Sequence, residues 1–100
     1  RLPKACGDRF ANRIQRLLRT LDGEMDRRAA AFAAVSAASI QEYRELADAA
    51  LPRILLLIDN YPDFKKDWEV APGRGPSYRT FMRILGEGRT LGVHTVITAD

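Results

Sequence analysis

Apolar residues form one unbroken run near the middle of the chain, at residues 54–58. A run without alternation is typical of a strand buried on both faces, as in a parallel sheet covered by helices, and Pro52 fits only at its start. Residues 93–98 are rich in β-branched side chains and predict a second strand. Because a helical segment lies between the two, we expect a right-handed βαβ crossover and an α/β fold.

Apolar residues at helical spacing predict a long helix before the first strand. We interpret residues 1–7 as a loop and Asp8 as the N-cap. Gly23 weakens this helix without ending it, because strong helix formers continue as far as Phe32. The expected buried face consists of Phe10, Ile14, Leu17, Leu18, Leu21 and Met25.

One short helix is predicted before the first strand and another after it. Ser39 and Glu42 have the spacing of a capping box, and the helix that they open must end before Pro52. After the strand, Phe64 and Trp68 stand four residues apart and indicate a helix on which the two rings pack together.

A further helix is predicted to begin at Ser77, after a loop at residues 71–76. The glycines of this loop could bring backbone N–H groups to a phosphate, but its prolines lack that donor and no strand directly precedes it. We therefore interpret the loop as a connector. The helix has the apolar face Tyr78, Phe81, Met82 and Leu85, with Arg79 and Arg83 directed outward.

Asp59 ends the first predicted strand and is the first candidate for chemistry. Ligands of open α/β sheets bind at the carboxyl ends of the strands, and a carboxylate held there can orient a hydrated Mg²⁺ on a nucleotide. If the two strands are neighbours, Thr98 reaches the same edge, where its hydroxyl could contact a phosphate or a water. The alternatives are that Asp59 and Asn60 only form a turn and that Thr98 is only a good strand former.

Composition limits the class of protein. The chain has 100 residues, 46% of them apolar and 29% charged, which is typical of one small globular domain. The apolar run is too short to cross a bilayer, and the single Cys6 cannot form an internal disulfide. The chain begins without methionine, so we expect a piece of a longer protein.

The net charge of +3 permits contact with phosphates but does not require nucleic acid. Arginines recur along the first predicted helix, and no aromatic residue for base stacking is interleaved with them. We interpret this stripe as a solvated face, and the alternatives are a surface for nucleic acid or for a neighbouring subunit. Its members are Arg9, Arg13, Arg16 and Arg19.

Two segments resemble the FtsK/SpoIIIE family of P-loop motor ATPases: RILLLIDNY at residues 53–61 and LGEGRTLGVHTVITAD at residues 85–100. Within that family the chain is most similar to the EccC branch, the membrane-anchored ATPases of actinobacterial type VII secretion systems. The glycine-rich part, residues 86–94, is the most specific. By contrast, an apolar strand ending in Asp is common to very many NTPases.

The resemblance implies that residues 1–100 are a partial ATPase domain of RecA-like P-loop fold, with parallel strands flanked by helices. No lysine of the chain follows a glycine, so the Walker A loop that cradles phosphates is absent. The implied cofactors of the intact domain are ATP and Mg²⁺. The implied partners are other ATPase domains or subunits of a hexameric motor at the cytoplasmic face of the cell membrane, and a secreted substrate protein. Nucleic acid is disfavoured, and contact with the membrane would come only through the full-length protein.

The resemblance also assigns roles to three residues. Asp59 becomes the Walker B aspartate that binds Mg²⁺ through water, and Thr98 the polar residue that ends the sensor strand. Arg89 becomes a residue of the inter-subunit surface that stabilises phosphate charge in a neighbour's site. The alternative for Arg89 is a cation favoured by a helix C-terminus, and we interpret His94 as a packed histidine.

Asn60 departs from the family pattern. Active members have a Glu or a second Asp directly after the Walker B aspartate, whereas an amide can hold a water but cannot accept its proton. We therefore expect a domain that binds ATP and hydrolyses it slowly, with a regulatory or structural role. The alternatives are a piece of an active FtsK-type DNA translocase and a degenerate domain that docks secretion substrates.

Overall fold

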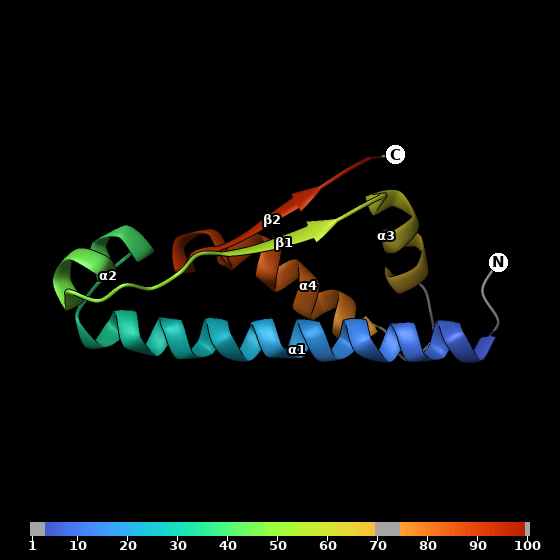
Figure 1. Ribbon diagram of the computed structural model, residues 1–100, viewed down its shortest axis with the longest axis horizontal. Helices are drawn as coiled ribbons and strands as arrows, with labels where there is room; N and C mark the ends of the chain where they lie inside the picture. The colour runs from blue at the N-terminus through green and yellow to red at the C-terminus, as the bar shows by residue number, and fades with distance from the viewer. Residues whose placement is uncertain (1–3, 70–74, 100) are drawn as a thin grey trace.

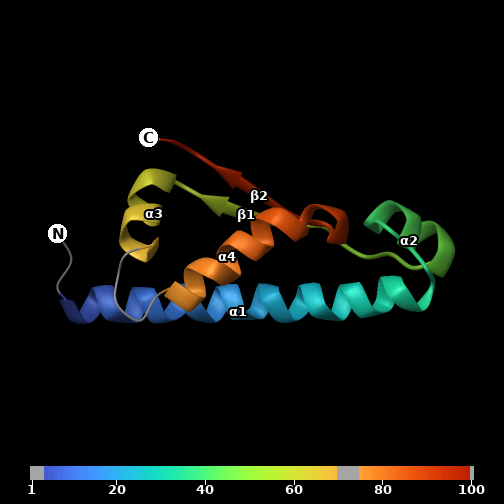
Figure 2. The same cartoon turned by 180° about the vertical axis from the view of Figure 1, so that it is seen from behind.

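The structure is a computed structural model that describes the backbone of residues 4–69 and 75–99 and the side chains of residues 12–66 and 75–99. Its elements follow one another as α1 (Lys4–Ala34), α2 (Ile40–Ala47), β1 (Ile54–Ile58), α3 (Tyr61–Glu69), α4 (Gly75–Glu87), the 3₁₀ turn η1 (Arg89–Leu91) and β2 (Val93–Ile97). In Figure 1, α1 runs along the whole length of the molecule, with the strands on one side of it and α2 and α3 near opposite ends. Figure 2 shows α4 crossing obliquely between α1 and the strands.

The two strands are parallel and hydrogen-bonded to each other, with Ile54 opposite Val93 and Ile58 opposite Ile97. This confirms that they are neighbours and that their carboxyl ends share one edge of the sheet. The described chain is thus a mixed structure of helices and a small parallel sheet, compatible with the predicted α/β class.

A core of apolar side chains fills the space between α1, α4 and one face of the sheet. Phe81 and Met25 are completely buried, and the aromatic rings of Phe64 and Phe81 meet edge to face with their centroids 4.9 Å apart. The buried cluster consists of Leu18, Leu21, Met25, Leu56, Phe81, Ile84 and Val93. The apolar faces of α1 and α4 therefore pack into the core beneath one face of the sheet, as their helical periodicity predicted.

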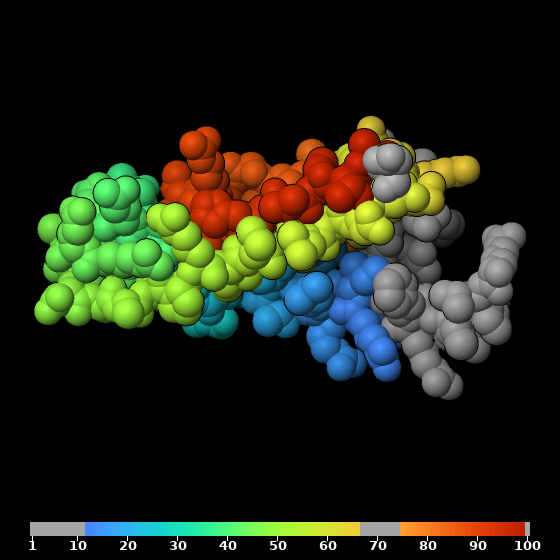
Figure 3. Space-filling view, turned by 45° about the horizontal axis from the view of Figure 1, so that its top comes forward, coloured from blue at the N-terminus to red at the C-terminus, as the bar shows by residue number. Residues whose placement is uncertain are grey.

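The other face of the sheet is uncovered, so the prediction of a strand buried on both faces is wrong. Leu56 is buried on the core side, whereas Leu55 is 62% and Leu57 is 68% exposed. Val96 of β2 is also exposed, and Figure 3 shows the two strands side by side on the surface. Because none of the described helices packs over this face, the apolar run projects every second side chain into solvent.

The first helix starts earlier than predicted. It begins at Lys4, so the expected loop at residues 1–7 is wrong from Lys4 onward and Asp8 lies inside the helix. Gly23 is helical as expected, and Leu17 is half-exposed although it was assigned to the buried face. The side chains of Cys6, Phe10, Arg9 and Trp68, and residues 71–74 of the connector, lie outside the described residues.

The capping residue of α2 was predicted correctly. The hydroxyl of Ser39 accepts a hydrogen bond from the backbone N–H of Glu42, at 3.3 Å, and Ser39 has extended backbone as an N-cap requires. The predicted faces of α4 are partly wrong, since Met82 is half-exposed while Ile84 is buried.

Arg83 was predicted to point outward, but it joins α4 to α1. Its guanidinium donates to the carboxylates of Asp22 and Asp26 on α1 and to Glu87 on α4. The hydrogen bonds that it donates to Asp26 and Asp22 raise the pKa of Arg83 above its already high usual value, so it stays charged. The prediction that Arg83 points outward is wrong because the sequence does not reveal which carboxylates of α1 lie opposite α4.

Arg28 is 4% exposed and connects the amino-terminal ends of both strands to α1. Its guanidinium donates to the carbonyl oxygen of Pro52 at 2.7 Å and to that of Leu91 at 2.9 Å. Its Nε binds Glu24 at 2.8 Å, and this hydrogen bond is the main reason why the pKa of Glu24 is lowered. All three donated bonds compensate the cost of burying the cation.

Within the described part of the chain, we find no helix both long and apolar enough to cross a lipid bilayer.

Candidate functional site

Asp59 and Thr98 lie side by side where the two parallel strands end. Asp59 directly follows β1 and Thr98 directly follows β2, and the strand register pairs the two residues before them. The backbone N–H of Thr98 donates to the carbonyl of Ile58 at 2.9 Å, so the ladder continues up to the candidate residues. The prediction that both reach one edge of the sheet is therefore confirmed.

The two side chains are hydrogen-bonded to each other. The Thr98 hydroxyl donates to Oδ1 of Asp59 at 2.6 Å, a short bond of the kind formed between a hydroxyl and a carboxylate. Both residues are exposed, so the carboxylate is accessible to a ligand from solvent. The rigid ends of two strands thus fix an accessible negative charge.

Asn60 turns the chain from β1 into α3. Its φ of 55° lies in the left-handed region, which Asn tolerates better than most residues. Its backbone N–H donates to the Thr98 hydroxyl at 2.7 Å, and its side-chain Nδ2 donates to Asp63 at 2.8 Å. Thr98 therefore holds the Asn60 backbone at the strand edge, and Asp63 on α3 holds its side-chain amide.

The edge has the donor type that Mg²⁺ prefers. Mg²⁺ keeps several waters and is commonly bound through one or two carboxylates together with substrate phosphates. Asp59 supplies one such carboxylate, and among the described residues no group of three or more His, Cys, Asp or Glu side chains could form a protein-only metal cage. This donor set fits an ion that arrives with a nucleotide.

Arg89 is not part of this cluster. It lies in η1, before β2 begins, so the whole length of that strand separates it from Thr98. A strand of this length spans roughly 16 Å. Arg89 is exposed at the opposite end of the sheet, and a role for it at the Asp59 edge would require a second subunit.

His94 lies in β2, away from the candidate edge. Its Nε2 is buried and has no hydrogen-bond partner among the described residues, and the same is true of the Thr95 hydroxyl in the next position. Within the described ranges, neither the His94 Nε2 nor the Thr95 hydroxyl has a partner that would prepare it for acid or base chemistry.

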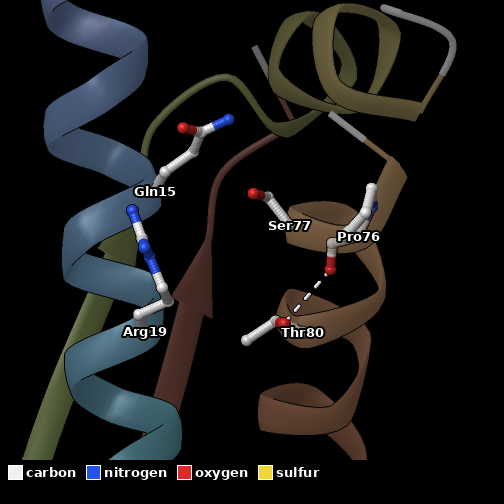
Figure 4. Close-up of a pocket in the computed structure, with 5 residues that line it drawn as sticks. All are labelled: Gln15, Arg19, Pro76, Ser77 and Thr80. Atoms are coloured by element: carbon white, nitrogen blue, oxygen red, sulfur yellow. Dashed lines mark hydrogen bonds between the residues drawn. The ribbon is translucent and has the colours of Figure 1, made fainter. Parts of the chain in front are cut away.

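A pocket of about 360 Å³ lies elsewhere, between α1 and the first turns of α4. Figure 4 shows Gln15 and Arg19 contributed by α1, opposite Pro76, Ser77 and Thr80 of α4, with the Thr80 hydroxyl donating to the Pro76 carbonyl at 3.1 Å. None of its lining residues belongs to the strand edge. We therefore place the candidate site at Asp59 and Thr98 rather than in this pocket.

Sequence reasoning missed two features of the edge. It left the reach of Asp63 open, although the spacing of Asn60 and Asp63, three residues apart at a helix start, is that of a capping pair. It also gave no indication that the Asn60 N–H reaches Thr98, because that contact depends on the pairing of β1 with β2.

Comparison with curated proteins finds the type VII secretion system protein EssC of Staphylococcus aureus. The chain is 30% identical over 89 residues to EssC of strain NCTC 8325 / PS 47 and likewise 30% identical over 89 residues to EssC of strain Mu50 / ATCC 700699. The aligned part is 89% of this chain and 6% of either EssC sequence. The chain is thus similar to one short stretch of a far longer protein.

No protein-family model matches the sequence, and no solved structure matches the fold.

Proposed function

We propose that this chain is part of a nucleotide-binding ATPase domain in a protein-export machine of the type VII secretion kind. The similarity to EssC over most of the chain supports the secretion context. The observation that carries the nucleotide reading is the Asp59 carboxylate, held by the Thr98 hydroxyl at the shared end of two parallel strands. Open α/β sheets bind their ligands at that end.

In this proposal the fold is part of a RecA-like P-loop core. β1 is the Walker B strand and β2 the sensor strand, with α1 and α4 covering one face. The remaining strands of the core, including the one that leads into the Walker A loop, belong to another part of a longer protein. The exposed apolar face of β1 is consistent with a sheet that is covered by another layer in such a protein.

The residues at the strand edge would have different roles in binding Mg-ATP. Mg²⁺ bound with ATP would neutralise charge on the phosphates. Asp59 would hold the ion through water, and Thr98 and Asn60 lie within hydrogen-bond distance of each other beside it. The Asn60 amide donates to Asp63, which leaves its carbonyl oxygen to hold a water without accepting a proton. We therefore propose binding with slow hydrolysis, and a regulatory or structural role.

The proposed partners follow from the same context. They are further ATPase domains or subunits of the same motor, one of which would meet Arg89, and the secreted protein that the motor handles. The proposed location is the cytoplasmic face of the cell membrane, reached through the full-length protein.

A second candidate function is the docking of secretion substrates by a domain that has lost nucleotide binding. The observation that favours it is the apolar outer face of the sheet, where Leu55, Leu57 and Val96 are exposed. The two candidates differ in whether ATP binds.

The test is calorimetry of Mg-ATP binding to the longer parent protein, comparing wild type with Asp59→Ala. We expect wild type to bind and Asp59→Ala to bind roughly 10- to 100-fold more weakly, the usual cost of losing a group that supports a metal. Glu45→Ala is the matched control, because Glu45 is an exposed carboxylate on α2, and Figure 1 shows α2 at the other end of the molecule from the carboxyl ends of the strands. Its affinity should equal that of wild type.

Two results would contradict the proposal. Equal affinities of wild type and Asp59→Ala would remove Asp59 from the site. Absence of binding by the wild-type protein would leave the docking function as the better explanation.

A further inference from the structure

The Thr98 hydroxyl has no free proton. A threonine hydroxyl carries one proton and two acceptor lone pairs. The proton is donated to Asp59 Oδ1 at 2.6 Å, and one lone pair accepts the Asn60 N–H at 2.7 Å. A residue in this state cannot also donate to a phosphate or to a water, which is the role first expected of it.

The backbone aims this hydroxyl at Asp59. The N–H of Thr98 donates to Ile58 at 2.9 Å, and its carbonyl oxygen accepts from the N–H of Tyr61 at 2.7 Å. Thr98 is therefore bonded on one side to the last residue of β1 and on the other to the first residue of α3. With both peptide groups fixed, its side chain faces the turn formed by Asp59 and Asn60.

We propose that Thr98 is a positioning residue that holds the Asp59 carboxylate in the orientation needed for the metal, and that it does not contact the nucleotide. This inference rests on the proposed function. An exposed aspartate is free to rotate about two side-chain bonds, and Asp59 is exposed. A short bond from a fixed hydroxyl removes that freedom before the ligand arrives, which is the general advantage of preorganised sites.

The same hydroxyl also stabilises the turn beside it. Asn60 has a left-handed φ of 55°, and its N–H points at Thr98. One oxygen thus fixes both the carboxylate that would direct the metal and the backbone of the residue that follows it. The structure assigns to Thr98 the task of coupling these two neighbours.

The experiment measures ATP affinity of the parent protein with Mg²⁺ and with EDTA, for wild type, Thr98→Val, Thr98→Ser, Asp59→Ala and the double variant. Valine matches the shape of threonine without the hydroxyl, so it should weaken Mg-ATP binding roughly tenfold, the scale of lost support for a metal ligand. Binding in EDTA should not change. Serine keeps the hydroxyl and should restore the affinity to within about twofold of wild type.

The double variant identifies the route by which Thr98 acts. If Thr98 works through Asp59, Thr98→Val adds nothing once Asp59 is alanine, because residues that act as one unit are not additive. Equal weakening in Mg²⁺ and in EDTA, or an additive loss in the double variant, would show direct contact with the nucleotide and overturn the inference.

The remaining outcomes are also decisive. Failure of Thr98→Ser to restore binding would mean that the hydroxyl is not responsible, and would overturn the inference while wild-type binding upholds the proposed function. If wild type itself binds no Mg-ATP, the proposed function is wrong, and this inference is wrong as well. The two failures are distinguished by the wild-type measurement alone.

Discussion

At the scale of single residues, Thr95 shows what a misplaced hydroxyl costs. Thr95 pairs with Leu56, whose side chain is on the core side of the sheet. The Thr95 Oγ1 is buried and has no hydrogen-bond partner in the described part of the chain. A polar atom buried in this way loses its bonds to water and gains none in return. Threonine suits the strand backbone, but at this position its hydroxyl opposes folding.

We predict that Thr95→Val stabilises the protein. Valine has the same shape and removes the buried hydroxyl, so the free energy of unfolding should rise by about 1 kcal/mol. Urea unfolding followed by circular dichroism measures the change. Thr90→Val is the control, because Thr90 is exposed and its replacement should change stability by less than about 0.5 kcal/mol. A loss of stability in Thr95→Val would mean that the hydroxyl has a partner.

The sequence predicted the meeting of Asp59 and Thr98 because two neighbouring parallel strands bring their carboxyl ends to one edge of the sheet. It did not predict which atoms would pair, and it could not place Asp63 relative to Asn60. Those contacts depend on the left-handed turn at Asn60, a conformation that the residue type permits but does not require. Arg28 was missed for a related reason: nothing in a run of helix formers reveals which arginine faces two strand ends.

At the scale of elements, Gly92 fixes the distance between the β2 start and two other parts of the chain. Its φ is 82°, in the left-handed region, and an added Cβ would collide with the end of the Ile40 side chain and approach Arg28 Nη1 to 2.9 Å. The glycine is therefore needed both for its backbone conformation and for its small size.

We predict opposite effects of alanine at two glycines that are only six positions apart. Gly92→Ala should lower the free energy of unfolding by about 1–3 kcal/mol, because it forces a left-handed alanine against Ile40. Gly86→Ala should raise it by about 0.5–1 kcal/mol, because Gly86 is helical and an added Cβ meets nothing within 4 Å. Thermal or urea unfolding of the two variants provides the comparison. Similar effects at both sites would contradict this account of η1 and β2.

Element types were predicted better than their surroundings. The strand at residues 54–58 and the N-cap at Ser39 follow from local signals, and both are present. The start of α1 was misplaced because Asp is a favoured N-cap residue type, whereas Asp8 lies inside the helix, beyond its first turn. Burial on both faces of β1 was predicted from apolar character alone, and apolar character does not determine what lies opposite.

At the scale of the whole molecule, the chain is elongated. Its radius of gyration is 15.6 Å and its principal extents are 49 × 25 × 19 Å, whereas a compact domain of this length has a radius of gyration of about 13 Å. The long helix α1 accounts for the shape, since the sheet and α4 cover only part of it (Figure 1). Because the molecule is thin, the described helices cover the sheet on one face, and the other face is exposed.

We predict that the isolated chain associates with itself through the outer face of the sheet. Exposed apolar strands promote association, and Leu57 is the most exposed of the large apolar side chains. Leu57→Lys should reduce association in sedimentation velocity and change the free energy of unfolding by less than about 0.5 kcal/mol. Leu46→Lys is the control, because Leu46 is 55% exposed on α2, outside this face. Equal association of the two variants would contradict the prediction.

The contacts of Arg28 with the two strand starts, here called the Arg28 clamp, place different demands on the sequence from those of the Asp59 edge. Arg28 binds the carbonyl oxygens of Pro52 and Leu91, and every amino acid has a carbonyl oxygen. The Arg28 clamp therefore depends on the position of the backbone at residues 52 and 91 and does not depend on which side chains stand there. Mutations at the opposite edge, where Asp59 and Asn60 lie, leave it untouched. The residue that follows Asp59 can thus be exchanged while Arg28 keeps both strand starts bound to α1.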